Sequence, residues 1–291
     1  MQIETLKVFC DLVETESFSK AAKINFISQS AVSQQIQALE YNYNQKLIIR
    51  DNRNLIPTEA GKIFYQGVKE ILQLYEDLSS QMQALSNTVS GTVKISTVYS
   101  VGLHELPPYE KQFLKDYPAV RVLVQYRHAS QVYEDVIHNI AHLGMVAYPV
   151  KKSQIEIMPF KHDRLVSICS PNHPFASLSK INLQDIQGQK FIAFERGIPT
   201  REALERIFGE YDVTPQIVME FDNIETVKRA VEIDAGISIV PKMTVKYEVE
   251  HQTLRVLEFE NQTFERPIGI LYKKGKKFSP AVQKFVDFLT E

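Results

Sequence analysis

Apolar side chains recur at helical spacing in the first part of the chain. A helix over residues 2–15 carries an apolar stripe of Ile3, Leu6, Phe9, Leu12 and Val13. The sequence SFSKAAKI predicts a second, short helix with Ser17 or Ser19 as its cap, and SQSAVSQQIQALE predicts a third helix capped by Ser28. Because only short links separate the three helices, we expect them to pack together.

The third predicted helix, residues 29–40, has an unusual polar face. Its apolar side is made by Ala31, Val32, Ile36 and Leu39, and its other side by Gln29, Ser30, Ser33, Gln34 and Gln37. Solvated helix faces usually use Lys and Glu, whereas Gln pairs with adenine through two hydrogen bonds and Ser hydrogen-bonds several bases. A short helix, a tight turn and such a helix match a helix-turn-helix, whose second helix enters the major groove. An ordinary amphipathic helix is the alternative.

Two further elements follow this motif. The sequence KLIIRDNRNLIPTEAG predicts a small two-stranded wing around the turn-prone RDNRN. Apolar residues then alternate at spacings of four and three through Phe64, Val68, Ile71, Tyr75, Leu78, Met82, Leu85 and Val89. So narrow a seam is typical of a two-helix coiled coil and favours dimerisation. The alternative is a long helix packed on its own domain.

From residue 91 onward, predicted strands and helices alternate. Strands are expected at 92–98, 120–126, 143–148, 190–194, 216–221 and 236–241, with two more near 253–259 and 268–273. The expected helices lie near 102–117, 130–140, 199–211 and 223–234, and a last one starts at Ser279. Strand, helix, strand repeats predict parallel sheet with crossover helices, arranged as two α/β lobes.

Composition and charge narrow the class of protein. A hydrophobic share of 44% with 23% charged residues is ordinary for a globular protein, and neither a membrane span nor a signal sequence is visible, so we expect a cytoplasmic protein without membrane contact. A net charge of -2 argues against a uniformly basic nucleic-acid binder. However, residues 17–39 contain Lys20 and Lys23 and no acid, and one acid-free face can meet a phosphate backbone.

The cysteines, histidines and glycines of the chain do not form enzyme or metal-binding motifs. Cys10 and Cys169 lack a CxxC context and are expected to pack as small apolar residues, with a redox pair as the alternative. His138 and His142 are four apart but have no third ligand candidate, so we interpret them as surface residues and expect no metal site. The chain has no GxSxG, P-loop or GxGxxG, and the sequence therefore supports neither an enzyme nor a cofactor.

The segment ESFSKAAKINFISQSAVSQQIQALEYNYNQKLIIRDNRNLIPTEAG resembles the amino-terminal region of LysR-type transcriptional regulators. A paired-Ala helix, an SQSAVS helix, LE, a short wing and TEAG follow there in this order. The resemblance is specific over residues 1–65 and looser over the rest. It implies an α/β protein with a helix-rich, winged helix-turn-helix domain over 1–59, a dimerising linker helix over 60–90, and a two-lobed, periplasmic-binding-protein-like effector domain over 91–291.

The resemblance also implies which residues meet DNA. Carried over by position, it makes the α-helical residues Gln29, Ser30, Ser33 and Gln34 groove contacts, and Arg50, Arg53 and Thr58 backbone or minor-groove contacts at the wing. Lys20 and Ser28 complete the expected DNA-binding set. The chain has Asn25 where the family has Leu, Asn44 where it has Gly, and Ile48 where it has Phe. Asn44 suits a left-handed position, whereas Ile24 or Phe26 is expected to fill the place of the missing Leu.

For the lobes, the resemblance implies a small-molecule site in the cleft between them, lined by strand ends and helix starts. Here Ser100, Ser130, Thr200 and Asn223 stand where helices begin, and unpaired amides at helix starts suit a carboxylate, sulfate or phosphate. The alternative is that each of these residues is only an ordinary helix cap. The full expected set is Tyr99, Ser100, Val101, Ser130, Tyr148, Pro199, Thr200 and Asn223.

The sequence thus predicts a sequence-specific DNA-binding transcriptional regulator controlled by a small, anionic effector. Its expected partners are double-stranded DNA, the effector and further copies of itself in a homodimer or homotetramer, with RNA polymerase as an additional candidate. The alternative is a two-lobed solute-binding or transferase-like protein whose N-terminal helices serve only for assembly.

Overall fold

The computed structural model describes residues 2–51, 54–84 and 89–290. The chain forms two compact units. Residues 1–91 together with 138–140 make the N-terminal unit, and residues 92–137 together with 141–291 make the C-terminal unit.

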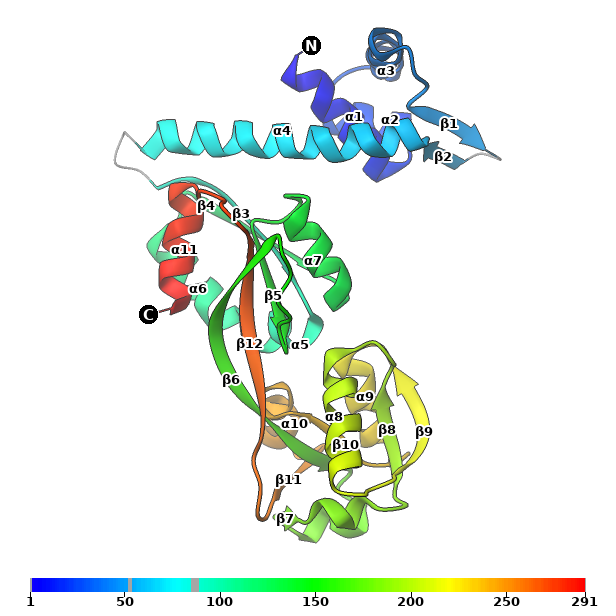
Figure 1. Ribbon diagram of the computed structural model, residues 1–291, viewed down its shortest axis with the longest axis vertical. Helices are drawn as coiled ribbons and strands as arrows, with labels where there is room; N and C mark the ends of the chain where they lie inside the picture. The colour runs from blue at the N-terminus through cyan, green and yellow to red at the C-terminus, as the bar shows by residue number, and fades with distance from the viewer. Residues whose placement is uncertain (1, 52–53, 85–88, 291) are drawn as a thin grey trace. The chain divides into compact units, whose positions relative to one another are not determined.

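The N-terminal unit contains the three predicted helices, the wing and a long helix (Figure 1). Its elements are α1 (Ile3–Thr15), α2 (Phe18–Ile24), α3 (Gln29–Tyr43), β1 (Ile48–Asp51), β2 (Asn54–Pro57) and α4 (Glu59–Ala84). The apolar faces of these helices enclose one core, to which each helix contributes: Leu6, Phe9, Leu12, Ala21, Val32, Ile36, Leu39 and Val68. Strands β1 and β2 pair antiparallel beside it.

Helix ends in this unit follow the expected capping, with one correction. Ser17 Oγ accepts from Lys20 N at 3.3 Å, Ser28 Oγ accepts from Ala31 N at 3.1 Å, and Asn44 ends α3 in the left-handed region at φ 48°. The expectation for Asn25 was wrong. Phe26 is 96% exposed and Ile24 51% exposed, so neither fills the place of the missing Leu. Instead, Asn25 Nδ2 donates to Asp11 Oδ2 at 2.7 Å and joins α2 to α1 through a hydrogen bond.

The apolar seam of α4 divides into two halves. Phe64 packs edge-on against Phe9 with ring centroids 5.0 Å apart, and Val68 is buried in the core of the unit. Beyond them, the seam residues Ile71, Tyr75, Leu78 and Met82 are 42%, 49%, 56% and 61% exposed. Leu85 lies outside the described residues, and Val89 follows the described end of the helix.

The C-terminal unit has two lobes. The first lobe contains β3 (Gly91–Thr97), α5 (Tyr99–His104), α6 (Pro107–Asp116), β4 (Val120–Tyr126), α7 (Ala129–Ile137), β5 (Leu143–Ala147) and α11 (Pro280–Thr290). The second contains β7 (Lys180–Ile181), β8 (Lys190–Phe194), α8 (Pro199–Glu210), β9 (Gln216–Phe221), α9 (Ile224–Glu232), β10 (Ser238–Pro241), α10 (Lys246–Glu250) and β11 (Arg255–Phe259). Short 3₁₀ helices lie at Pro174–Ser177, Leu183–Ile186 and Lys242–Val245.

Two long strands, β6 (Ile155–Cys169) and β12 (Phe264–Lys273), run through both lobes (Figure 1). The main sheet has the order β4-β3-β5-β12-β6-β11-β7, with β10 also paired to β6. The pairs β3–β5 and β8–β9 are parallel, as predicted, whereas β12 is antiparallel to β5 and β6. The sequence did not predict β6, because Pro159 and the charged residues 161–164 interrupt its apolar pattern where the strand passes from lobe to lobe.

Two smaller expectations have a clear outcome. The helix expected near 102–117 is two helices, because Pro107 and Pro108 start a new one. Cys10 and Cys169 are buried in apolar clusters, as predicted.

The surface interpretation of His142 was wrong: it is 1% exposed, and its Nδ1 accepts from Lys94 N at 2.9 Å. Burial, with Lys276 and Lys94 nearby, lowers the pKa of His142 to about 3.

Candidate DNA-binding face and effector pocket

The residues expected to contact bases lie on the outer side of α3. Gln29, Ser30 and Gln34 are exposed, and Ser33 is half-buried. Ser19 Oγ of α2 donates to Gln29 Oε1 at 3.1 Å, so that the two helices share a hydrogen bond on this face. The apolar side of α3 is buried in the core of the N-terminal unit. This geometry presents a polar, acid-free helix face on a fixed support.

The remaining residues of the expected DNA-binding set differ in their surroundings. Lys20 is exposed on α2, and the hydroxyl of Ser28 is shared between the Ala31 amide and Ser30 Oγ at 2.8 Å. Thr58 Oγ1 donates to the Lys46 carbonyl at 2.6 Å and accepts from Gly61 N at 2.9 Å, which makes it the cap of α4. The side chain of Arg50 and the whole of Arg53 lie outside the described residues.

Glu40 connects α3 to the wing and was not singled out from the sequence, although it is the acid of the LE pair. Its side chain is 9% exposed. Its carboxylate accepts from Leu47 N at 3.0 Å, from Ile48 N at 3.3 Å and from Lys46 Nζ at 2.7 Å. Burial alone would raise the pKa of Glu40, but Lys46 and the two amides outweigh it and hold the pKa below its ordinary value. The start of the wing is therefore fixed to α3 by a charged group with all its partners inside the chain.

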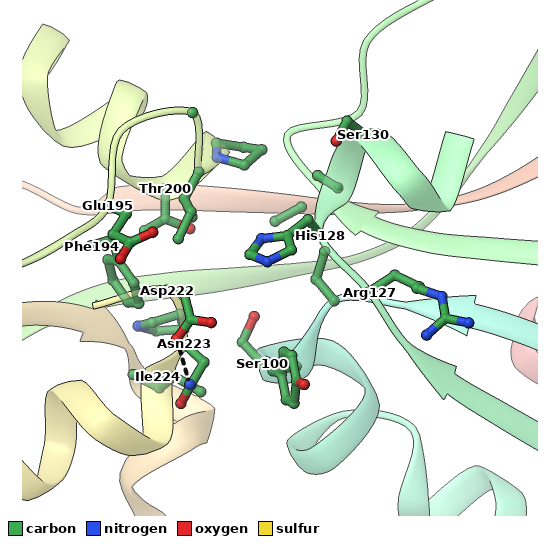
Figure 2. A pocket seen from close by; sticks show the side chains of 18 of the residues that line it. Ser100, Arg127, His128, Ser130, Phe194, Glu195, Thr200, Asp222, Asn223 and Ile224 are labelled. Atoms are coloured by element: carbon green, nitrogen blue, oxygen red, sulfur yellow. Dashed lines mark hydrogen bonds between the residues drawn. The ribbon is translucent and has the colours of Figure 1, made fainter. Parts of the chain in front are cut away.

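A cavity of about 320 Å³ lies between the lobes of the C-terminal unit. Figure 2 shows Ser100, His128 and Ser130 on one side of it and Glu195, Thr200, Asp222 and Asn223 on the other. Six of the eight residues expected at an effector site line it: Tyr99, Ser100, Ser130, Pro199, Thr200 and Asn223. Val101 does not, because its side chain is fully buried, and Tyr148 does not line it either. Loops far apart in sequence thus converge, as a two-lobed fold predicts.

Of the four polar residues expected at helix starts, only Asn223 caps its helix through a described side-chain hydrogen bond. Asn223 Oδ1 accepts from Thr226 N at 3.1 Å and caps α9. Ser100 and Thr200 stand inside the first turns of α5 and α8, whose caps are Val98 and Ile198. Ser100 Oγ instead accepts a hydrogen bond from Arg266. Its hydroxyl therefore serves the cavity rather than the helix end.

Arg266 is the functional candidate that the sequence analysis missed. It lies on β12, is 1% exposed and lines the cavity. Its Nη2 donates to Ser100 Oγ at 2.6 Å, while its Nε and Nη1 make no hydrogen bond with any described residue. The nearest carboxylate, Asp163 Oδ2, is 3.9 Å from Nη1. Burial lowers the pKa of Arg266, although Asp163 counteracts it. The cavity thus has a buried cation with two of its three guanidinium nitrogens not hydrogen-bonded to any described residue.

Acidic groups occupy the second-lobe side of the same cavity. Glu195 and Asp222 follow the paired strands β8 and β9, and both carboxylates point into the cavity (Figure 2). Glu195 N donates to the Phe221 carbonyl at 2.9 Å, which keeps these two strand ends together. The guanidinium of Arg127 extends away from them, toward Asp135 at 3.6 Å (Figure 2). The cavity is therefore asymmetric, with a buried cation at one place and carboxylates at another.

Two family models match the chain. Residues 3–62 match the "Bacterial regulatory helix-turn-helix protein, lysR family", and residues 86–291 match the "LysR substrate binding domain". The chain belongs to the LysR family. It is a DNA-binding transcriptional regulator, not an enzyme, and it carries a domain for a small-molecule effector, as the sequence predicted. The alternative, a solute-binding or transferase-like protein, does not account for the match at 3–62. We call the C-terminal unit the effector domain from here on.

Similar proteins agree with this assignment. The HTH-type transcriptional regulator CysL of Bacillus subtilis is 29% identical over 94% of this LysR chain and 91% of its own length. The HTH-type transcriptional activator CmpR of Synechocystis is 29% identical over 99% and 94%. Full-length CbnR, solved with its target DNA, has a TM-score of 0.76 at 21% identity over 99% of both chains. The effector domain of QuiR, solved with shikimate, has a TM-score of 0.63 at 25% identity over 69% of this chain and 96% of its own.

The described part of this LysR regulator brings no three His, Cys, Asp or Glu side chains into a metal-binding group. Within the same residues, no helix has the length and apolarity that a membrane crossing requires.

Proposed function

We propose that the effector of this LysR regulator is a small organic or inorganic anion that pairs with Arg266 in the cavity between the lobes. The observation that carries the proposal is the state of Arg266. Buried donor atoms of a charged group that lack acceptors cost free energy, and in native proteins such atoms are usually hydrogen-bonded. An anion beside Ser100 would supply the acceptors that Nε and Nη1 lack. Shikimate, the anion bound by the QuiR effector domain, belongs to this chemical class.

The carboxylates of Glu195 and Asp222 would set the orientation of the effector. Like charges repel, so the anionic group belongs at Arg266 and Ser100, away from these two side chains. Hydroxyl or amine groups on the rest of the effector would donate to Glu195 and Asp222. Ser130, Thr200 and Asn223 offer further polar contacts along the cavity. A hydroxylated acid therefore fits the cavity better than a simple dianion does.

Thermal shift measurements test this proposal. Wild-type protein and the variants Arg266→Met and Thr200→Val are melted with sulfate, phosphate or shikimate at rising concentration. A bound anion at a hundredfold excess over its dissociation constant stabilises the wild type by about 2.7 kcal/mol. We expect Arg266→Met to lose the shift and Thr200→Val to reduce it. Arg121→Met, which removes an exposed charge on β4, is the matched control. An unchanged response in Arg266→Met would exclude the site.

We also propose that α3 contacts base edges in the major groove through Gln29, Ser30, Ser33 and Gln34, with Lys20, Ser28, Arg50, Arg53 and Thr58 positioning the duplex. Its exposed, acid-free polar face supports this assignment. DNA selected from a random pool by the wild-type protein provides the probe. Gln34→Ala should lose about 1 to 3 kcal/mol of binding free energy on that DNA and much less on random DNA. Gln66→Ala, an exposed change on α4, should alter neither.

The exposed half of the α4 seam supports a further proposal, that residues 60–90 join two copies of the chain in a homodimer or, with further contacts, a homotetramer. We also propose the cytoplasm as the location of this DNA-binding regulator, and RNA polymerase as an additional partner.

A further inference from the structure

Helix α2 ends in a backbone conformation that normally requires glycine. Ile27 N donates to the Ala22 carbonyl at 3.1 Å, and Phe26 N donates to the Lys23 carbonyl at 3.4 Å. These two bonds form a Schellman motif, in which the residue after the C-cap takes the left-handed region. That residue is Phe26, at φ 55°. Gly adopts this region without cost and Asn at low cost, whereas a bulky side chain is strained there.

Packing does not compensate for this strain. The side chain of Phe26 is 96% exposed, so the folded chain removes almost none of its ring from water. Neither the backbone nor the core of the N-terminal unit explains a phenylalanine at this position. Strained residues of this kind cluster at active sites, ligand-binding clamps and switch regions.

The surroundings of Phe26 indicate the partner. Two residues later, Ser28 caps α3, and the exposed Gln29 and Ser30 follow in its first turn. On the other side, Lys20 and Lys23 of α2 are exposed and form no ion pair with any residue that the structure describes. The ring therefore projects beside two exposed lysines, at the end of α3 that a helix-turn-helix brings to base edges.

We propose that Phe26 contacts DNA and recognises the 5-methyl group of a thymine beside the bases contacted by α3. Apolar side chains, Phe among them, distinguish thymine in the major groove by this methyl group. Burying the ring against it removes apolar surface of both partners from water. The inference rests on the proposed function, namely that α3 enters the major groove. It makes Phe26 a specificity-determining residue that stabilises the complex at the expense of the free protein.

The variant Phe26→Asn tests the inference, because Asn tolerates the left-handed region. We expect the melting temperature of Phe26→Asn to equal or exceed that of the wild type, and its affinity for the selected DNA to fall severalfold. Deoxyuridine is then substituted for thymidine one position at a time. Loss of one methyl contact should weaken wild-type binding about fourfold at one position, and Phe26→Asn should be insensitive there. Phe26→Gly serves as a second variant with the same expected results.

Tyr41→Gln is the matched control, since it removes another exposed aromatic ring, near the other end of α3, and should change neither stability nor binding. Four results would overturn the inference: wild-type affinity in both Phe26 variants, equal loss on thymine and uracil DNA, a lowered melting temperature in both variants, or an altered oligomeric state in sedimentation. Gln34→Ala separates this inference from the proposed function. If Gln34→Ala binds the selected DNA with wild-type affinity, the assignment of α3 to the major groove is itself wrong, whatever the Phe26 variants show.

Discussion

Glu40 and Arg266 are both buried charges, yet the protein treats them in opposite ways. In the N-terminal unit, the Glu40 carboxylate receives two backbone amides and the Lys46 ammonium, and all these partners lie within nine residues of chain. In the effector domain, Arg266 makes one hydrogen bond, to Ser100, and leaves Nε and Nη1 without a described acceptor. The Glu40 carboxylate thus joins α3 to the wing through partners within its own unit. The acceptors that Arg266 lacks are supplied, on our proposal, by a ligand.

Helix α4 shows the same contrast with apolar side chains. Phe64 and Val68 are packed within the N-terminal unit, whereas Leu78 and Met82 continue the same seam in an exposed state. Side chains that stabilise the fold are therefore packed or hydrogen-bonded within the chain, whereas those that we assign to partners are not. Substituting one side chain of each kind tests this distinction.

The largest effect is expected on the exposed part of α4. Leu78→Lys places a charge in each helix of the proposed coiled coil, and a buried, unpaired charge raises the dissociation constant of the dimer by at least about a hundredfold. Sedimentation velocity at several protein concentrations measures it. Gln66→Lys, an equal charge change away from the seam, should leave the dimer intact. An unchanged oligomer in Leu78→Lys would mean that the seam packs within its own chain.

A slightly smaller effect is expected at Glu40, the buried charge that has its hydrogen-bond partners within the N-terminal unit. Glu40→Ala leaves the Leu47 and Ile48 amides without their acceptor and should cost about 2 to 3 kcal/mol of unfolding free energy. Denaturant unfolding, with hydrogen exchange at α3 and β1 to localise the loss, measures it. The removal of the exposed Glu59 by Glu59→Ala should cost less than about 0.5 kcal/mol.

The same variant has a pH signature. Because the folded-state pKa of Glu40 is depressed, its contribution to stability is full above its ordinary value of 4.5 and is lost as the pH falls through the folded-state pKa. The difference between wild type and Glu40→Ala should therefore shrink in acid. If the difference in unfolding free energy between wild type and Glu40→Ala stays constant down to the pH at which the protein unfolds in acid, Glu40 does not stabilise the fold through its negative charge.

The contrast between the two units also separates what the sequence could predict from what it could not. The polar face of α3 comes from one continuous stretch, where helical periodicity alone assigns every side chain to a face. Ser100, Thr200 and Asn223 were found because polar residues at helix starts are a local signal. Arg266 was not, because its partner Ser100 is 166 residues away and no local pattern joins them. Ile24 or Phe26 was expected to fill the place of the missing Leu, because hydrophobicity does not reveal that Phe26 is exposed at a left-handed turn.

A third, intermediate effect is expected from His142. Its folded-state pKa of about 3 lies below the ordinary 6.5, so between these values the unfolded chain binds a proton that the folded chain does not. Stability should therefore fall as the pH drops below 6.5, by up to about 1.4 kcal/mol per pH unit. In His142→Asn, Asn Oδ1 can still accept from Lys94 N but does not titrate, so urea unfolding from pH 7 to 5 should show a smaller slope. His251→Asn, an exposed control, should keep the wild-type slope.

The smallest effect is expected for Arg266→Met in the ligand-free protein. Two of the three guanidinium nitrogens have no described hydrogen bond to lose, and replacing a buried charge by an apolar side chain of similar length relieves its burial cost. Asp163 would lose its nearest cation, but burial already raises its pKa and favours the neutral acid. We therefore expect unfolding free energies within about 1 kcal/mol of the wild type. If ligand-free Arg266→Met were instead destabilised as much as Glu40→Ala, Arg266 would be a structural charge satisfied by the fold, and the cavity would need no anion to complete it.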